Sequence, residues 1–196
     1  QQLSETKEKL KTLRKIDINK LDKETKIDYK FIESILVGEE IENEEIQSWK
    51  KDPRDYMNFR QISTTINGPK NCEDKINYLL KYLPVVKSDL NLGVSQLESY
   101  VPRFQELGLY MAKNSNSIFN DEKNNLFISC NSSSETNKKT ILKLSSEIIE
   151  ALNVFINFLE IDLPNKQKSS FSIGKETYNK MLKNQFLLDY TDETLW

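Results

Sequence analysis

Histidine is absent from this sequence of 196 residues, and glycine and proline are scarce. A chain without imidazole has neither a histidine general acid or base nor a histidine ligand for zinc. Glycine and proline number five each, well below their usual share, and so few helix breakers favour helix. The composition therefore predicts an all-α protein and excludes histidine-dependent catalysis by these residues alone.

An excess of one charge and long apolar runs are lacking too. The 28 basic and 30 acidic residues leave a formal net charge of -2. Nucleic-acid binding gains much of its affinity from lysine and arginine that displace counterions from phosphates, so this balance predicts no nucleic-acid partner. The sequence has no apolar stretch long enough for a transmembrane helix, and we expect no membrane-spanning segment.

Only two cysteines occur, Cys72 and Cys130, and neither belongs to a C-x-x-C pair. Thiolate zinc sites and thioredoxin-like redox chemistry therefore lack their residues. Two cysteines in a chain of this length do not make a disulfide framework. A single bridge would form if the chain is exported, but the sequence favours two unrelated thiols.

Ser172 and Lys175 match the S-x-x-K pattern, in which a lysine activates a serine nucleophile. The companion K-T-G motif is missing, and Ser48 and Lys51 match the same pattern, as is common in a lysine-rich chain. We therefore interpret Ser172 as an N-cap or linker residue, and a small serine hydrolase is a remote alternative. The acidic run at residues 39–45 lacks the spacing of a calcium loop and is interpreted as a solvated helix surface. The sequence predicts no catalytic residue, no metal ligand and no cofactor in this chain.

Apolar residues recur at the three- and four-residue spacing of amphipathic helices over most of the chain. Residues 138–161 give the clearest case, with a broad apolar face that is typical of a helix inside a bundle. Ile27, Phe31 and Ile35 give a similar face to a helix that runs from residue 23 into the forties. We also expect helices over residues 2–15, 56–67, 71–84 and 95–111, and a last helix that begins near residue 174. The helix over residues 95–111 would start at a capping box formed by Ser95 and Glu98.

These elements predict an irregular multi-helix bundle, with one helical domain over residues 1–196. Residues 113–137 are rich in Asn and Ser and are predicted to be mainly loop, and residues 164–172 are predicted to be a linker. The apolar run at residues 126–128 is ambiguous, and it leaves open one short strand or hairpin near residues 126–130.

Two parts of the sequence resemble the bacterial domain of unknown function 885 family. In the first, Trp49, Pro53 and Tyr56 follow an acidic-apolar run at the family's spacing. In the second, Gly174 and Glu176 begin a segment that precedes a long helix in the family. The matching stretches are residues 26–37, 45–49, 52–56, 82–84, 171–178, 181–182 and 189–195, and in this order they cover nearly the whole chain.

The resemblance implies a mostly helical protein of several hundred residues, often exported or lipid-anchored, that is similar to zinc metallopeptidases. The family's H-E-x-x-H-type helix lies beyond the matched region, so no zinc ligand or general base can be placed here, and zinc would belong to the full-length protein. The chain would be the N-terminal part that packs on the remaining C-terminal part of the same polypeptide. Lys175, Glu176 and Tyr178 would then be the candidates for contact with a peptide substrate.

The leading hypothesis is a catalytically silent N-terminal helical segment of a peptidase-like protein, secreted or in the cell envelope, that partly walls a catalytic cleft. The absent initiator Met and a helix start predicted at Thr191 favour a piece of a longer protein. The alternative is a free-standing secreted or envelope module that binds a protein partner through an exposed apolar groove. Sequence that continues beyond Trp196 into a histidine-containing helix would favour the first hypothesis.

Overall fold

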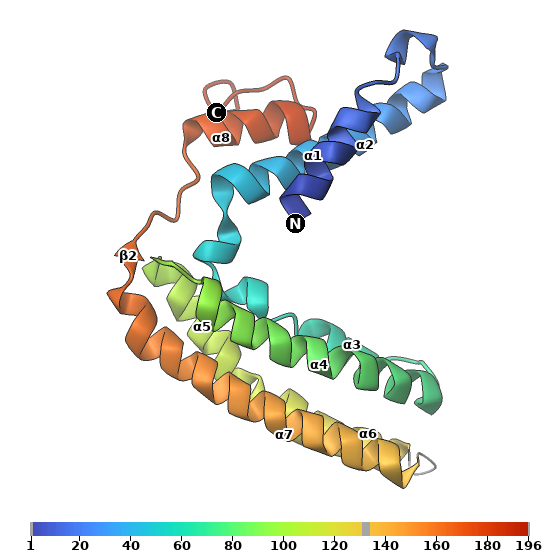
Figure 1. Cartoon of the computed structure of the whole chain (residues 1–196), viewed down its shortest axis with the longest axis vertical. Helices are drawn as coiled ribbons and strands as arrows, with labels where there is room; N and C mark the ends of the chain where they lie inside the picture. The colour runs from blue at the N-terminus through green and yellow to red at the C-terminus, as the bar shows by residue number, and fades with distance from the viewer. Residues whose placement is uncertain (1, 131–133, 196) are drawn as a thin grey trace. The chain divides into compact units, whose positions relative to one another are not determined.

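The structure is a computed structural model that describes residues 2–130 and 134–195, and most of these residues are helical (Figure 1). The prediction of an all-α, irregular multi-helix fold is confirmed. The chain forms two compact units: unit 1 comprises residues 1–48 and 172–196, and unit 2 comprises residues 49–171. The single domain over residues 1–196 stays a prediction, because this division does not show whether the units fold separately. No helix in the described part of the chain has the length and apolar character needed to cross a bilayer.

Unit 1 is built from two antiparallel helices and a C-terminal helix. Its elements are α1 (Gln2–Leu13), η1 (Ile18–Lys20), α2 (Lys23–Ile41), the π-helical turn η2 (Glu42–Ile46), α8 (Lys175–Lys180) and the π-helical turn η8 (Met181–Gln185). Asp22 caps α2 by accepting a hydrogen bond from a backbone amide. α1 is joined to α2 by a hydrogen bond from Thr6 Oγ1 to Glu39 Oε2 (2.9 Å) and by an ion pair between Arg14 and Glu33 (2.9 Å).

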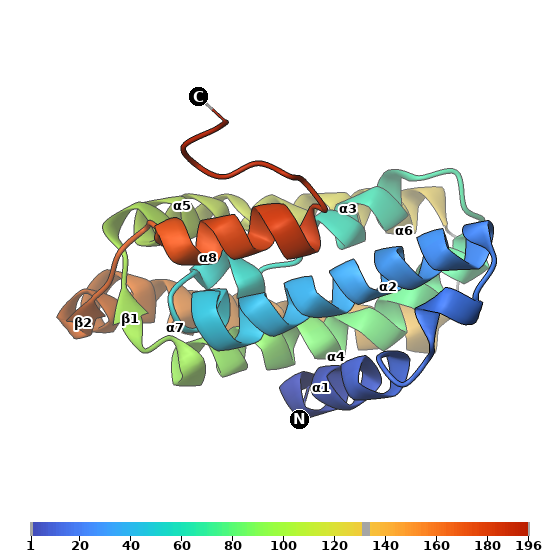
Figure 2. The same ribbon diagram turned by 90° about the horizontal axis from the view of Figure 1, so that it is seen from above.

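The apolar face of α2 is only partly covered. Its C-terminal half packs against η8, which continues directly from α8 (Figure 2). There the Gln185 side chain lies directly against Gly38. Another strip of the helix is open to solvent, because Ile27 and Phe31 are each 61% exposed and Ile35 is 46% exposed. We call the surface that these three side chains form the α2 face. Their spacing predicts the helix correctly, but the α2 face is not part of the core.

Unit 2 is organised around α4 and α7, which lie side by side along its length (Figure 1). Its elements are η3 (Ser48–Lys50), η4 (Pro53–Tyr56), α3 (Arg60–Asn67), α4 (Cys72–Gln96), β1 (Ser99–Tyr100), α5 (Pro102–Asn114), η5 (Ile118–Glu122), α6 (Lys123–Ser129), α7 (Glu135–Asn157), η6 (Phe158–Asp162), η7 (Leu163–Asn165) and β2 (Gln167–Lys168). Fully buried members of its core include Leu79, Leu83, Leu90, Ile141, Ile148, Leu152, Phe155 and Leu159. The broad apolar face predicted for residues 138–161 is therefore the centre of this core.

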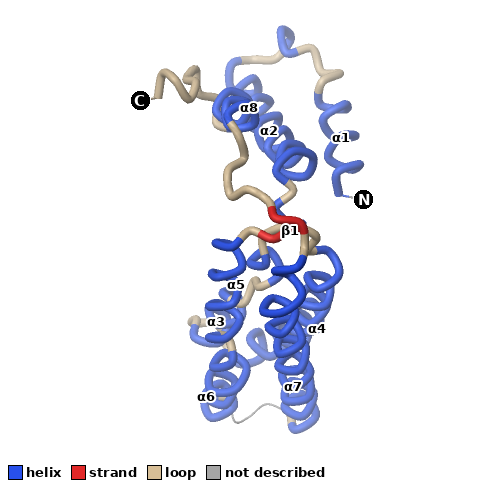
Figure 3. Tube along the Cα trace, turned by 90° about the vertical axis from the view of Figure 1, so that its left-hand side faces the viewer, coloured by secondary structure: helices blue, strands red, loops and turns tan. Residues whose placement is uncertain are grey.

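The two strands form a short parallel pair in unit 2 (Figure 3). Ser99 lies opposite Gln167 and Tyr100 opposite Lys168, and the Ser169 amide continues the pairing with a hydrogen bond to the Tyr100 carbonyl (2.8 Å). This pair ties the segment after α4 to the segment after η7. The predicted linker over residues 164–172 is thus anchored at its start.

The strand or hairpin considered near residues 126–130 is wrong, because residues 126–129 belong to helix α6 and Cys130 follows it in a turn. Within its three-residue apolar run, Leu126 is buried and Ile128 is 77% exposed, as expected when one side of a helical turn faces the core. The prediction that residues 113–137 are mainly loop is also wrong over the described part, which holds the end of α5, η5, α6 and the start of α7. Residues 131–133 lie outside the described residues. Asn and Ser have low helix propensity, but burial of Phe119 and Leu126 stabilises these short helices.

The helix start predicted at Ser95 is wrong as well. α4 continues to Gln96, and α5 begins only at Pro102. Ser95 Oγ donates a hydrogen bond to the Leu92 carbonyl (2.8 Å), within the last turn of α4. The capping-box pattern here marks a helix end, because Leu97 still packs into the core and keeps the preceding turn helical.

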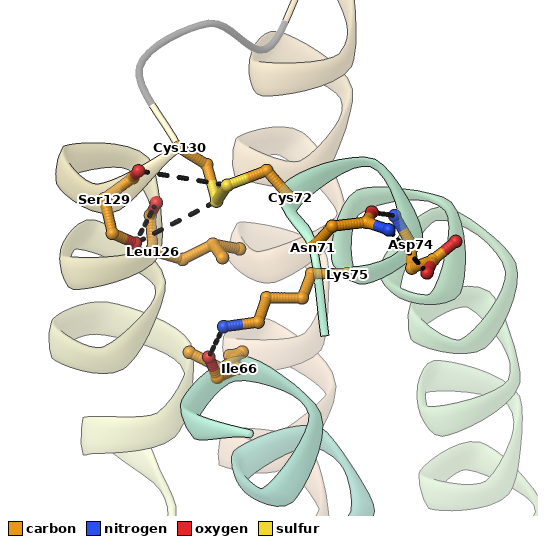
Figure 4. The surroundings of a disulfide bond; sticks show 8 residues. All are labelled: Ile66, Asn71, Cys72, Asp74, Lys75, Leu126, Ser129 and Cys130. Carbon is orange, nitrogen blue, oxygen red and sulfur yellow. Dashed lines mark hydrogen bonds between the residues drawn. A yellow bond between two sulfur atoms is a disulfide. The ribbon is translucent and has the colours of Figure 1, made fainter. Parts of the chain in front are cut away.

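Cys72 and Cys130 are joined by a disulfide, with their Cα atoms 5.5 Å apart (Figure 4). Cys72 is the first residue of α4, whose N-cap Asn71 accepts a hydrogen bond from the Asp74 amide (2.8 Å), and Cys130 directly follows α6. The interpretation of two unrelated thiols is therefore wrong. The cysteines are 58 residues apart in the sequence and meet only because α6, predicted as loop, packs beside the start of α4.

Alanine at Gly93, in the interior of α4, should destabilise unit 2 by about 2 kcal/mol. A Cβ atom there would lie 2.8 Å from the rings of both Phe155 and Tyr56, and these rings are buried. Gly38→Ala in α2 is the matched control, since the atoms nearest to its Cβ belong to the flexible side chain of Gln185, whose buried Oε1 accepts no hydrogen bond from the described residues. We expect Gly38→Ala to leave the free energy of unfolding unchanged or slightly raised. Urea unfolding of the two variants and the wild type measures both effects, and equal stabilities would contradict the prediction.

Candidate functional site

The three residues proposed as substrate contacts lie at the start of α8 in unit 1. Gly174 precedes the helix with φ 84°, a conformation that favours glycine. Lys175 forms ion pairs with Asp192 (3.2 Å) and Glu193 (2.6 Å) of the C-terminal segment. Glu176 lies 3.7 Å from the ammonium group of Lys180, and Tyr178 is half-buried. Their assignment as substrate contacts stays a prediction, and the structure engages the first two in local ion pairs.

α8 is also bound to η2, through a residue of the acidic run that was predicted to be a solvated helix surface. Glu45 accepts hydrogen bonds from Thr177 Oγ1 (3.0 Å) and from Lys180 Nζ (2.9 Å). The hydrogen bond from Lys180 lowers the pKa of Glu45, with a smaller contribution from Thr177. Glu45 therefore keeps its negative charge and fixes α8 against the end of the α2–η2 segment.

The acidic run at residues 39–45 is thus more than a solvated helix surface. Besides Glu45, Glu39 accepts a hydrogen bond from Thr6, and Glu44 forms an ion pair with Lys7 of α1. The run links α1 and α8 to the same part of α2 and η2. Its only sequence signal is its charge density, which does not reveal partners that are distant in the chain.

A polar cavity of about 760 Å³ lies in unit 1, between α2, η2, η8 and the segment after η8. Its charged lining is balanced, and among the lining residues Arg14 is paired with Glu33 and Lys180 with Glu45. The other charged lining residues are Lys30, Glu40, Lys183 and Asp189. The lining described for this cavity does not include Lys175, Glu176 or Tyr178, so the predicted contact residues and the cavity are separate features.

The serine–lysine pattern at residues 172–175 serves the local backbone. Ser172 Oγ accepts a hydrogen bond from the Gly174 amide (3.2 Å), as serine does in tight turns. Hydrogen bonds to Glu193 and then Asp192 raise the pKa of Lys175. A lysine that activates a nucleophile needs the opposite shift, so the geometry gives Lys175 no role as a base.

Carboxylates arranged for catalysis or metal binding do not stand out elsewhere. Burial raises the pKa of Asp89 in α4, but within the described residues no hydrogen bond or ion pair joins it to a second acid or a base. Across residues 2–130 and 134–195, no group of three or more Asp, Glu or Cys side chains is placed to hold a metal ion. Zinc in a full-length protein stays a prediction.

The first stretch of the family resemblance lies at the start of unit 2, where its residues Trp49, Pro53 and Tyr56 make structural contacts. Tyr56 donates a hydrogen bond to the Trp49 carbonyl, and its hydroxyl also lies 3.0 Å from Gln96 Oε1. Pro53 packs against Gly108, where an added Cβ would lie 2.8 Å from the proline ring. The motif therefore fixes the start of the unit against α4 and α5.

Raising the pH from 10 to 12 should destabilise unit 2 through Tyr56. Burial raises the pKa of Tyr56 from 10.0 to about 12, with smaller contributions from Asp55 and Glu98. Between these values only the unfolded chain releases the phenol proton, so the free energy of unfolding falls by about 2–3 kcal/mol as the pH rises. Urea unfolding at several pH values measures this fall. Tyr56→Phe lacks the proton and should show a smaller fall, and an equal fall in both proteins would be evidence against the assignment.

The predicted helix start at Thr191 is a single turn, in which the Leu195 amide donates a hydrogen bond to the Thr191 carbonyl (3.0 Å). The side chains of Thr191 and Thr194 also interact within this turn. Trp196 lies outside the described residues. The turn positions Asp192 and Glu193 beside α8.

Together these observations define an all-α protein in which ion pairs join α8 to η2 and to the C-terminal segment. No family model matches the chain, and no curated protein matches it. Among solved structures it is similar to a protein from Shewanella oneidensis described as "a putative lipoprotein of unknown function", with a TM-score of 0.87 and 18% identity over 99% of this chain. The match covers 36% of that protein, so this chain spans about a third of its length. At this identity the likeness shows a shared fold.

Proposed function

We propose that this chain is a catalytically silent helical segment of a longer, peptidase-like protein, and that it packs on and partly walls a catalytic cleft formed by other sequence. Its role would be structural: to cover the flank of the cleft and to present the start of α8 to an extended peptide. The peptidase-like part of the proposal rests on the resemblance carried by the Trp49–Tyr56 and Gly174–Tyr178 stretches.

The observation that carries the packing role is the α2 face. Ile27, Phe31 and Ile35 stand one helical turn apart, and each exposes about half or more of its surface. Scattered exposed apolar residues are ordinary, but a row of large ones on one helix face is typical of an interaction surface. The α2 face is therefore the part of unit 1 best suited to be covered by another segment.

The similar structure supports a segment role, because the shared fold there makes up about a third of a longer chain. Histidine is absent from residues 1–196, so any imidazole ligand or base of the proposed cleft would come from other sequence. Both facts agree with a helical part that supports a centre located elsewhere in the polypeptide.

We place the protein outside the reducing cytosol, as a secreted or cell-envelope protein. The Cys72–Cys130 bridge supports this location, since structural disulfides persist mainly in oxidising compartments. Lipid anchoring is the finer form of the proposal. It rests on the resemblance and on the description of the Shewanella oneidensis protein.

Zinc titration and a peptidase assay on this chain test the proposed silence. With the disulfide intact, we expect no stoichiometric zinc binding by calorimetry and no cleavage of a mixed peptide library with or without zinc. Tight binding of one zinc ion, or turnover that survives purification, would overturn the proposal.

The alternative function is a free-standing helical module that binds a protein partner. The apolar groove between α1 and α2 favours it, since such grooves accept amphipathic helices. The genomic sequence after Trp196 separates the two: a histidine-containing continuation supports the segment role, and a stop codon supports the module.

A further inference from the structure

The groove between α1 and α2 has an apolar lining that faces solvent. Leu13 at the end of α1, Ile16 in the turn that follows it, and Ile32 and Leu36 of α2 line a hollow of about 600 Å³. Ile16 and Ile32 are both 46% exposed, although each is a large aliphatic side chain. The groove therefore offers apolar surface that the described part of unit 1 leaves in contact with water.

The groove is continuous with the α2 face. Ile32 is three residues from Ile35 and follows Phe31 directly, so these side chains cover adjoining strips of the same helix. From Glu24 to Leu36 this surface extends about 18 Å along α2, the length of roughly three helical turns. Its size and shape match one amphipathic helix laid along α2 with its apolar side inward.

Acidic residues border this surface. Glu5 and Glu8 of α1 line the groove together with one base, Lys9. Glu24 and Asp28 lie on the α2 face itself, three residues before Ile27 and Phe31 respectively, and both are exposed. Lys23 and Lys30 are also exposed, four residues before and three residues after Ile27, and they lie on the side of the α2 face away from the groove. On the groove side, four acids against one lysine favour a partner that carries Lys or Arg there, because opposite charges across an interface select partners and speed association.

We propose that the α1–α2 groove and the α2 face dock one amphipathic helix with basic flanks, supplied by the same polypeptide from sequence outside residues 1–196. The intramolecular source rests on the proposed function. The fold supports it, since it occurs in the Shewanella oneidensis protein as about a third of a longer chain. The charge preference rests on the groove alone and does not depend on a peptidase.

Two synthetic helical peptides of 18 residues, with the same leucine face and with either lysine or glutamate flanks, test the groove. Calorimetry at low salt should show the lysine peptide binding to residues 1–196 with a Kd at least about ten-fold lower than that of the glutamate peptide. Added salt should reduce the difference, because these charges are exposed. Equal affinities for the two peptides, or no binding of either, would overturn the proposal.

Single substitutions locate the bound peptide. Ile32→Asp places a charge in the groove and should weaken binding of the lysine peptide at least about ten-fold. Val154→Asp is the matched control, since Val154 is 57% exposed on α7 in unit 2 and should leave binding unchanged. Circular dichroism confirms that both variants fold. An equal loss of peptide binding in both variants would reject the proposed occupant. Self-association that depends on concentration, excludes the peptide and is abolished by Ile32→Asp would also reject it, and would show that a second copy of the chain occupies the groove.

Where the reading frame continues past residue 196, the longer protein tests the intramolecular source. Its own helix should already occupy the groove, so the lysine peptide should bind residues 1–196 and not the longer protein. Equal binding to both would overturn an occupant from the same chain. The peptide affinities test the groove, and the zinc and peptidase assays test the proposed function. Zinc binding or turnover by residues 1–196 would reject catalytic silence without altering the peptide affinities.

Discussion

Removal of the Cys72–Cys130 bridge should lower the free energy of unfolding of unit 2 by about 4 kcal/mol. The bridge closes a loop with a sequence separation of 58 that contains α4, α5, η5 and α6. Its main effect is on the unfolded chain, which gains conformational freedom when the loop opens. An effect of this size is a large fraction of the stability of a typical domain.

Urea unfolding of a Cys72→Ala, Cys130→Ala double variant measures this effect. Trp49 packs against the core of unit 2, and a Trp196→Phe background makes it the sole indole reporter. The dependence of stability on urea should become steeper, because an unbridged unfolded chain exposes more surface. A reducing agent should reproduce the loss in the parent protein and have no effect on the double variant. Equal stabilities of parent and double variant would show that the bridge does not stabilise unit 2.

Helices were predictable where a single segment has apolar residues at helical spacing along its whole length. Residues 138–161 and 23–41 have this period, and Asn71 and the first-turn acids mark the start of α4. The position of α6 and the formation of the disulfide both result from contacts between residues that are far apart in the sequence. Neither the composition of residues 113–137 nor the cysteine spacing contains that information.

The candidate site was predictable only in part, for the same reason. Gly174 and α8 are local features, and the sequence predicted them. The partners of Lys175 and the role of Glu45 come from segments 18 and 135 residues away, as the Lys175–Glu193 and Lys180–Glu45 contacts show. Periodicity identifies the α2 face but cannot say whether η8 or solvent covers it, so the surface that carries the proposed function emerged only with the fold.

Phe155→Ala should destabilise unit 2 by about 3–5 kcal/mol, the range for removing a fully buried phenylalanine from a core. Phe155 lies on α7 with 0% of its surface exposed, and its ring lies directly against Gly93 of α4. Its removal leaves a cavity at the contact between the two longest helices of the unit. Val154→Ala, at the neighbouring exposed position of α7, is the control and should change stability by less than about 0.5 kcal/mol.

Combining Phe155→Ala with Gly93→Ala separates close packing from a general loss of core. The methyl group at position 93 clashes with the Phe155 ring in the parent protein but enters the cavity once that ring is removed. The double variant should therefore be more stable than the sum of the two single effects, by about 1 kcal/mol or more. Strict additivity would mean that Gly93 and Phe155 do not share this space. Urea unfolding of the four proteins, followed through Trp49, completes the cycle.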